Sequence, residues 1–315
     1  MNLKDMYDIK QIKIDKENLT ISIENNIEKN SDCVMPFLSE MSIVINRIQK
    51  FLYNKIAKND IPPLIMLNFK INEDSMKITP YLLERSILNA VSKCTGTVNI
   101  LSIDIGDMNS KAFVKYSDIK NFRKLLNNIE NFSNRSFEEL SKIIDNKSVP
   151  SIENPEVINS AYLVNIKNKL QIVFKLDVIS IYEKYGEQFI FELLHCLNNS
   201  ESIKGIILDS SIKSYDNFIM KTIEFNSVES RNKLIKSLGI VNNYNNKYEH
   251  KVDKNKKKLK VITSDGVTSS KDIINYNKLG ADLVLFTTIF TLKGPLIFDN
   301  ICEDLKNEYK NSNNK

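Results

Sequence analysis

The fold is decided near the end of the chain, by LKVITSDGVTSS (residues 259–270) and GADLVLFTT (residues 280–288). Each stretch sets a short apolar run before a turn. A helical pattern follows the first turn as far as Leu279, and a second one opens at Gly294-Pro295. Repeated strand–turn–helix units would aim unpaired backbone N–H groups at one point, as an anionic phosphate requires. The sequence therefore predicts the phosphate-binding end of an α/β fold.

Length and charge limit the class of protein. The chain has 315 residues, of which 42% are hydrophobic, so it can bury one large core, and we expect a single main domain. Its 44 basic and 39 acidic residues are nearly balanced. The lysine-rich residues 254–260, with Tyr244 and Tyr248 nearby, could contact the phosphate backbone of a nucleic acid. This is a minor alternative, and we expect no nucleic-acid partner.

The cysteines argue against a metal site. Cys33, Cys94, Cys196 and Cys302 are widely separated and form no CxxC pair, so buried reduced thiols are expected. His195 precedes Cys196 inside a helical run over residues 187–197, which favours core packing over a nucleophilic pair. The sequence has no long uncharged apolar run and no apolar signal core at its start, which predicts a soluble intracellular protein as written.

Apolar spacing elsewhere predicts strands alternating with helices. A hairpin is expected over residues 11–23 and a helix over residues 36–56. Six strand–helix units follow. Their strands are expected at residues 64–68, 98–104, 172–176, 203–209, 259–263 and 280–286, and the first four helices at residues 80–94, 116–129, 185–197 and 229–238. This alternation indicates either an α/β barrel or a doubly wound sheet, and six units are fewer than the eight of a closed barrel.

Two polar stretches interrupt this alternation, at residues 133–164 and 241–257, and both are predicted to be exposed loops. The predicted organisation is a hairpin extension over residues 1–35, a barrel over residues 36–310 and a polar tail over residues 311–315.

The motifs together resemble the dihydroorotate dehydrogenases, and among them the quinone-using class 2 form. Asp265-Gly266-Val267-Thr268-Ser269 is similar to the family's Gly-Gly-Ile/Val-Ser-Ser/Thr, and Gly294-Pro295 to its final Gly-Pro. Val173 to Leu176 looks like its Val-Lys-Ile/Leu strand, and Gly205 to Ser211 like Gly-Leu-Ile-Val-Thr-Asn-Thr. The resemblance covers about residues 60 to 310 and is most specific at the end. It implies a TIM-type barrel, here incomplete at its N-terminal end.

The resemblance also implies a reaction, which is the FMN-dependent oxidation of dihydroorotate to orotate in pyrimidine synthesis. A quinone would accept the electrons, at the mitochondrial inner membrane or the periphery of a bacterial membrane. Residue by residue, it places Lys175 on the flavin ring and Asp107 at the position of the catalytic base. The other FMN-binding positions are Asn68, Ser210, Asp265, Gly266, Thr287 and Thr288. Substrate binding falls to Asn109 and Ser211, and no metal is implied.

The sequence departs from the family pattern at several of these positions. Asp107 replaces the family's serine base, Asp104 and Ser210 replace asparagines, and Asp265 replaces a glycine in the phosphate turn. The family's first two strands have no counterpart before residue 36. A carboxylate can act as a general base, but it would stand beside an anionic substrate. The second hypothesis is therefore a non-catalytic binding or assembly protein derived from this family.

Overall fold

The computed structural model describes residues 9–17, 20–25, 47–48, 50, 64–70, 80–104, 117–145, 170–216, 219–249 and 259–313. The chain divides into two compact units. The terminal unit contains Met1–Ser31, Leu176–Phe191 and Ile206–Lys315, and the central unit contains Asp32–Lys175 and Glu192–Gly205. The predicted helix over residues 36–56 and the loop residues 146–164 and 250–257 lie outside the described residues almost entirely.

Parallel strands follow one another in the order in which they occur in the chain. Their order is β3, β4, β5, β6, β9, β10. Their bounds are Met66–Lys70, Ile100–Asp104, Gln171–Leu176, Ile203–Asp209, Lys260–Ser264 and Leu283–Leu285. In a doubly wound sheet the spatial order of the strands reverses at a switch point, whereas in a barrel the strands keep the order in which they occur in the chain. The prediction of an incomplete TIM-type α/β fold with six strand–helix units is thus confirmed.

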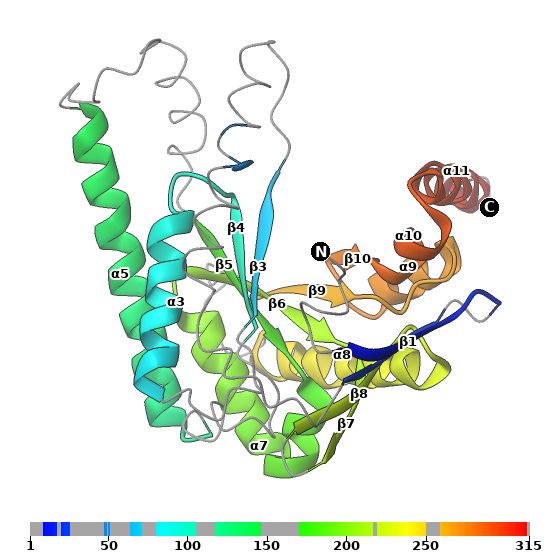
Figure 1. The fold of residues 1–315 in the computed structure, drawn as a ribbon, viewed down its shortest axis with the longest axis horizontal. Coiled ribbons are helices and arrows are strands. Elements are labelled where there is room, and N and C mark those ends of the chain that lie inside the picture. The colour runs from blue at the N-terminus through cyan, green and yellow to red at the C-terminus, as the bar shows by residue number, and fades with distance from the viewer. Residues whose placement is uncertain are drawn as a thin grey trace. The chain divides into compact units, whose positions relative to one another are not determined.

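The central unit packs helices α3 (Pro80–Cys94) and α5 (Ile119–Asp145) side by side (Figure 1). Helix α3 begins with proline, which suits the first helical position, and ends before Gly96 at φ 78°. Its residues Ile87, Ala90, Val91 and Cys94 are fully buried at helical spacing. The predicted bounds of this helix are confirmed.

Helix α5 is longer than expected, and the predicted loop from residue 133 is wrong for its first part. The helix continues to Asp145, and its buried positions repeat at helical spacing as far as Ser133: Phe122, Leu125 and Ile129 are followed by the buried Ser133. Phe122 meets Phe174 of β5 edge to face, with ring centroids 5.9 Å apart. The polar composition of this segment hid an amphipathic helix.

Helix α7 (Val178–Asn199) carries His195 and Cys196, which confirms that the pair is helical. The helix is interrupted at Gly186, whose φ of 83° and ψ of 175° are not helical. Cys196 is buried, and its Sγ lies 3.7 Å from Arg123 Nη2. The Cys196 side chain thus packs against the neighbouring helix α5, as the helical run predicted.

Helix α8 of the terminal unit spans Val228–Glu249, so the second predicted loop is wrong for residues 241–249. Residues Val241, Tyr244 and Asn245 are buried at helical spacing in an asparagine-rich stretch. Tyr244 packs edge to face on Phe191 of α7, with ring centroids 5.7 Å apart. Packing of this buried face stabilises the helix although its average composition is polar.

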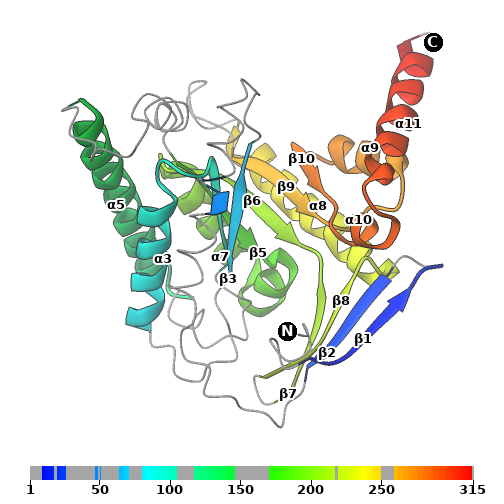
Figure 2. The same ribbon diagram turned by 45° about the horizontal axis from the view of Figure 1, so that its top comes forward.

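The same unit contains a four-stranded antiparallel sheet in the order β1, β2, β8, β7 (Figure 2). The bounds of these strands are Ile9–Asp15, Thr20–Asn25, Ile219–Phe225 and Ile212–Asp216. Strands β1 and β2 are the predicted hairpin, which lies outside the parallel sheet as expected. Strands β7 and β8 were not predicted, since residues 212–225 had no recognised pattern.

Three helices complete the terminal unit, and they follow the two stretches that decided the fold. They are α9 (Ser270–Lys278), α10 (Thr288–Lys293) and α11 (Leu296–Asn313). Strands β9 and β10 pair in parallel, with Leu283 opposite Ile262. Helix α10 was not predicted, because its six residues are too few to show a periodic pattern.

Candidate functional site

The turn after β9 brings four of the predicted phosphate-binding residues together. The backbone N–H of Asp265 donates to the carbonyl of Leu285 at 2.8 Å, which ties the ends of β9 and β10. The Asp265 carboxylate then turns toward α10, where its Oδ1 accepts from Thr287 N at 2.9 Å and Thr288 N at 2.8 Å. Through these two bonds the buried Asp265 carboxylate caps the start of α10.

Gly266, the next residue, is held by close packing. Its φ of 80° suits glycine, and a Cβ built there would lie 3.0 Å from both Leu234 Cδ2 and Tyr276 Oη. The Tyr276 hydroxyl donates to the Gly266 carbonyl at 2.6 Å. Burial raises the pKa of Tyr276 far above its usual value, and the Asp272 carboxylate raises the pKa further while Arg231 opposes it. The tyrosine is a neutral donor that fixes the turn.

The N-terminus of α9 is capped by a second carboxylate. Asp272 Oδ2 accepts from Thr268 N at 2.8 Å and from Ser269 N at 3.0 Å. The hydroxyl of Thr268 also donates to this oxygen, at 2.7 Å. A carboxylate in the first turn satisfies helix donors and complements the helix dipole. Backbone N–H groups at both turns of the predicted phosphate-binding site thus donate to the chain's own carboxylates.

The two predicted site serines after β6 are buried and bonded within the protein. Ser210 Oγ donates to the carbonyl of Ser264 at 2.6 Å. Ser211 Oγ donates to Asp209 Oδ1 at 2.8 Å, and its backbone N–H donates to the same oxygen at 3.2 Å. Each serine is about 1% exposed, so a bound ligand would have to displace these contacts to reach the hydroxyls.

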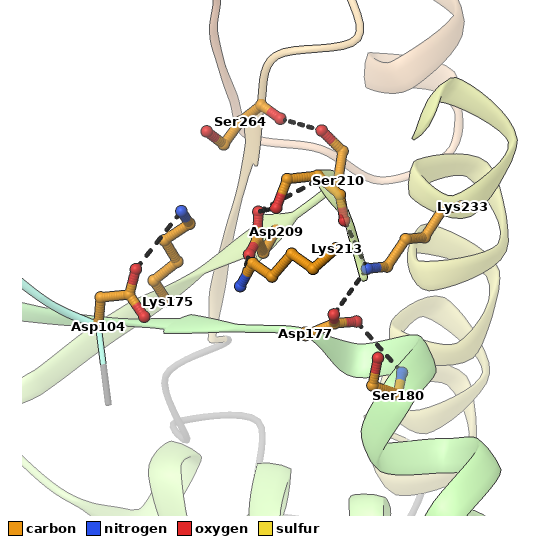
Figure 3. Close-up of polar contacts among 10 residues, drawn as sticks. Asp104, Lys175, Asp177, Ser180, Asp209, Ser210, Lys213, Lys233 and Ser264 are labelled. Carbon is orange, nitrogen blue, oxygen red and sulfur yellow. Dashed lines mark hydrogen bonds and ion pairs between the residues drawn. The ribbon is translucent and has the colours of Figure 1, made fainter. Parts of the chain in front are cut away.

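A charged network around these serines was missed by the sequence analysis (Figure 3). Lys213 Nζ lies 2.9 Å from Asp209 Oδ2. Lys233 Nζ lies 2.6 Å from Asp177 Oδ2 and donates to the carbonyl of Ser211 at 2.8 Å. One signal was available: Asp209 closes the buried strand β6 and Asp177 directly follows β5. A carboxylate at the end of a buried strand needs a partner.

In the central unit, the predicted flavin-ring lysine is paired with a carboxylate. Lys175 of β5 lies opposite Asp104 of β4 in the parallel register, and Lys175 Nζ is 3.5 Å from Asp104 Oδ2 (Figure 3). Asn68 lies on β3 with an exposed side chain, opposite Ser102 in the register. Asp107 and Asn109, the predicted base and substrate residue, lie outside the described residues.

Within the described residues, no group of three or more His, Cys, Asp or Glu side chains is placed to hold a metal ion. None of the helices in these parts of the chain has the length and apolar character needed to cross a membrane.

No protein-family model and no curated protein matches the sequence. Solved structures do match the fold. The crystal structure of DHODH from Eimeria tenella in complex with ferulenol is similar with a TM-score of 0.60 at 13% identity, covering 94% of this chain and 69% of that one. The ligand-free structure from Eimeria tenella gives 0.61 at 12% identity, covering 96% and 74%. The chain therefore has a fold similar to that of dihydroorotate dehydrogenase (DHODH).

Proposed function

We propose that this chain is a non-catalytic protein built on a DHODH-like fold, and that it serves in binding or assembly rather than in dihydroorotate oxidation. The observation that carries the proposal is the pairing of Lys175 with Asp104. The resemblance gives this lysine to the flavin ring, and the carboxylate stands where the family has a neutral asparagine. A lysine held by a buried carboxylate has its charge neutralised inside the protein.

The serines after β6 support the proposal independently. Ser210 stands where the family has an asparagine, whose amide can both donate and accept. Here the shorter hydroxyl donates to Ser264 O, and Ser211 donates to Asp209. Groups that would contact flavin and substrate are engaged by protein acceptors instead.

FMN is the cofactor that the resemblance implies, and the residues of the phosphate turn do not fit it. The amides of Thr287 and Thr288 already donate to Asp265. At about 5 Å and an effective dielectric near 20, a carboxylate would oppose each unit of phosphate charge by roughly 3 kcal/mol. The proposed function therefore involves no flavin chemistry.

The second candidate is an active dihydroorotate dehydrogenase with FMN and a quinone acceptor. The observation that favours it is the fold itself, which matches DHODH structures over nearly the whole chain. In that reading Asp107 is the base and dihydroorotate is the substrate. Fold similarity alone does not fix an activity, because one fold hosts many functions.

Absorbance spectroscopy separates the two candidates. The full chain is purified, mixed with excess FMN and freed of unbound ligand, and its flavin absorbance is compared with its protein concentration. We expect no retained flavin, and no dihydroorotate oxidation with a quinone acceptor. Stoichiometric flavin together with turnover would overturn the proposal. In that case, loss of turnover in Asp107→Asn would support the base assignment.

A further inference from the structure

We infer that the Asp265 carboxylate is a built-in replacement for a ligand phosphate. It accepts the two backbone amides at the start of α10, and it leaves no anion site at this end of β9 and β10. The inference deepens the proposed function and rests on it for the comparison with a flavin-binding fold. It concerns one side chain and two amides, so it can be tested separately.

The backbone at this turn is arranged around the carboxylate. Asp265 has a φ of 63°, in the left-handed region that residues other than glycine seldom adopt. Aspartate and asparagine tolerate that region better than most residues, because their short polar side chains bond locally. In this turn the side chain bonds across to the neighbouring strand–helix junction, with both bonds to one oxygen, Oδ1. The bonds to Thr287 and Thr288 offset the backbone cost.

The surroundings give the carboxylate little freedom to move away. Asp265 is 7% exposed and Thr288 is 4% exposed. On the far side of the turn, Gly266 lies against Leu234 and Tyr276, where an added Cβ would be 3.0 Å from both side chains. Removal of the carboxylate would leave Thr288 N buried without an acceptor, which is costly for a backbone donor.

An external phosphate would therefore compete with an acceptor that is already covalently attached. It would need the same two N–H groups and would approach a buried negative charge. Repulsion from one carboxylate at about 5 Å lowers affinity by about a hundredfold. Asp265→Gly removes this charge and suits the positive φ, which makes it the natural test variant.

Hydrogen exchange at single amides tests the inference on the full chain. Exchange at Thr287 and Thr288 is measured for the wild type and for Asp265→Gly, each alone, with inorganic phosphate and with FMN. In the wild type we expect both amides to be protected, and neither additive to change their exchange or the melting temperature. In Asp265→Gly we expect exchange at least about tenfold faster, as loss of a charged acceptor predicts.

A matched control sits at the other end of the same strand pair. Asp282 Oδ2 accepts from Val261 N at 2.9 Å, so Asp282→Asn also perturbs a carboxylate–amide bond of β9 and β10. We expect it to leave exchange at Thr287 and Thr288 at the wild-type rate. If Asp265→Gly does not fold, Asp265→Asn is measured instead; it keeps an acceptor oxygen without the charge, and faster exchange of both amides is again expected.

The inference is overturned if the wild-type amides exchange as unprotected ones, or if phosphate or FMN increases their protection. It is also overturned if the folded variant shows wild-type exchange. The two proposals fail in different ways: flavin-dependent turnover with both amides still protected by Asp265 would defeat the proposed function alone, whereas unprotected amides in a flavin-free protein would defeat this inference alone.

Discussion

Lys213 Nζ lies 2.9 Å from Asp209 Oδ2, and the two side chains are only 6% and 7% exposed. A buried ion pair adds little net stability compared with an apolar pair, but loss of one partner strands the other charge away from water. The pair also neighbours Ser211, which donates to the same aspartate. Loss of the pair would therefore also disturb Ser211, which the resemblance assigned to substrate binding.

Loss of this buried pair is the first prediction. Lys213→Met should lower the free energy of unfolding by about 3–5 kcal/mol, because Asp209 is left charged and buried. Arg135→Ala is the control, since Arg135 and Glu139 are an exposed pair at 3.7 Å, and it should cost no more than about 0.5 kcal/mol. Denaturant unfolding measures both, and equal effects would contradict the burial argument.

The second prediction is a double-mutant cycle on Asp104 and Lys175, with Asp104→Asn and Lys175→Met. We expect a coupling free energy of about 0.5–2 kcal/mol, moderated because the lysine side chain is 20% exposed. The comparison pair is Lys260 and Asp282, which is closer at 2.7 Å but 58% and 28% exposed. If burial outweighs distance, the comparison pair couples more weakly; the reverse order would contradict the prediction.

Two glycines with nearly the same positive φ provide the third prediction. Gly186 has a φ of 83° with no atom near an added Cβ, whereas Gly266 has a φ of 80° with Leu234 and Tyr276 at 3.0 Å. Gly186→Ala should cost about 1–3 kcal/mol from backbone strain alone, because its φ of 83° and ψ of 175° lie in a region that is essentially reserved to glycine. Gly266→Ala should cost about 1–3 kcal/mol more, because the added methyl group overpacks the turn. Equal melting temperatures for the two variants would show that space at Gly266 does not matter.

Alkaline pH provides the fourth prediction, through Cys94. Burial raises the pKa of this thiol from its usual 9.0 to about 12. Above pH 9 the unfolded chain loses this proton while the folded protein keeps it, so the unfolded state binds fewer protons and the free energy of unfolding falls as pH rises. The expected slope approaches 1.4 kcal/mol per pH unit between about pH 9 and pH 12.

The check is the denaturant midpoint as a function of pH. Cys94→Ala should be less stable than the wild type at pH 8, since a buried side chain is truncated, yet its midpoint should fall less steeply above pH 9. Cys302→Ala alters an exposed cysteine and should follow the wild-type curve. A wild-type slope in Cys94→Ala would assign the alkaline loss to other groups.

The sequence predicted the parallel elements well, because buried strands and the helices between them have distinct apolar periods. Strand Ile203–Asp209 and helix Pro80–Cys94 lie at their predicted bounds. The prediction failed where a polar stretch was interpreted as a loop. Tyr244 and Ser133 are buried on helices that continue through such stretches. One buried face decides a helix, and the average polarity of a segment does not reveal it.

The candidate site was predictable in position more than in chemistry. Residue type and spacing placed Asp265, Gly266, Thr287 and Thr288 at neighbouring turns, and the structure brings them together. The direction of the Asp265 side chain was open, since a carboxylate at a turn can face a ligand, solvent or a helix end. Partners such as Lys233 for Asp177 are distant in the sequence, so only the folded chain reveals them.

The carboxylate cap on α10 has a consequence for how the protein matures. Many cofactor-dependent proteins accumulate in a loosened apo form until their small molecule arrives, because the donors of the empty site are unsatisfied. Asp265 is made with the chain, so those donors find their acceptor as soon as β9 and β10 pair. Under the proposed function, the steady-state amount of this protein should therefore not depend on the riboflavin supply of the cell.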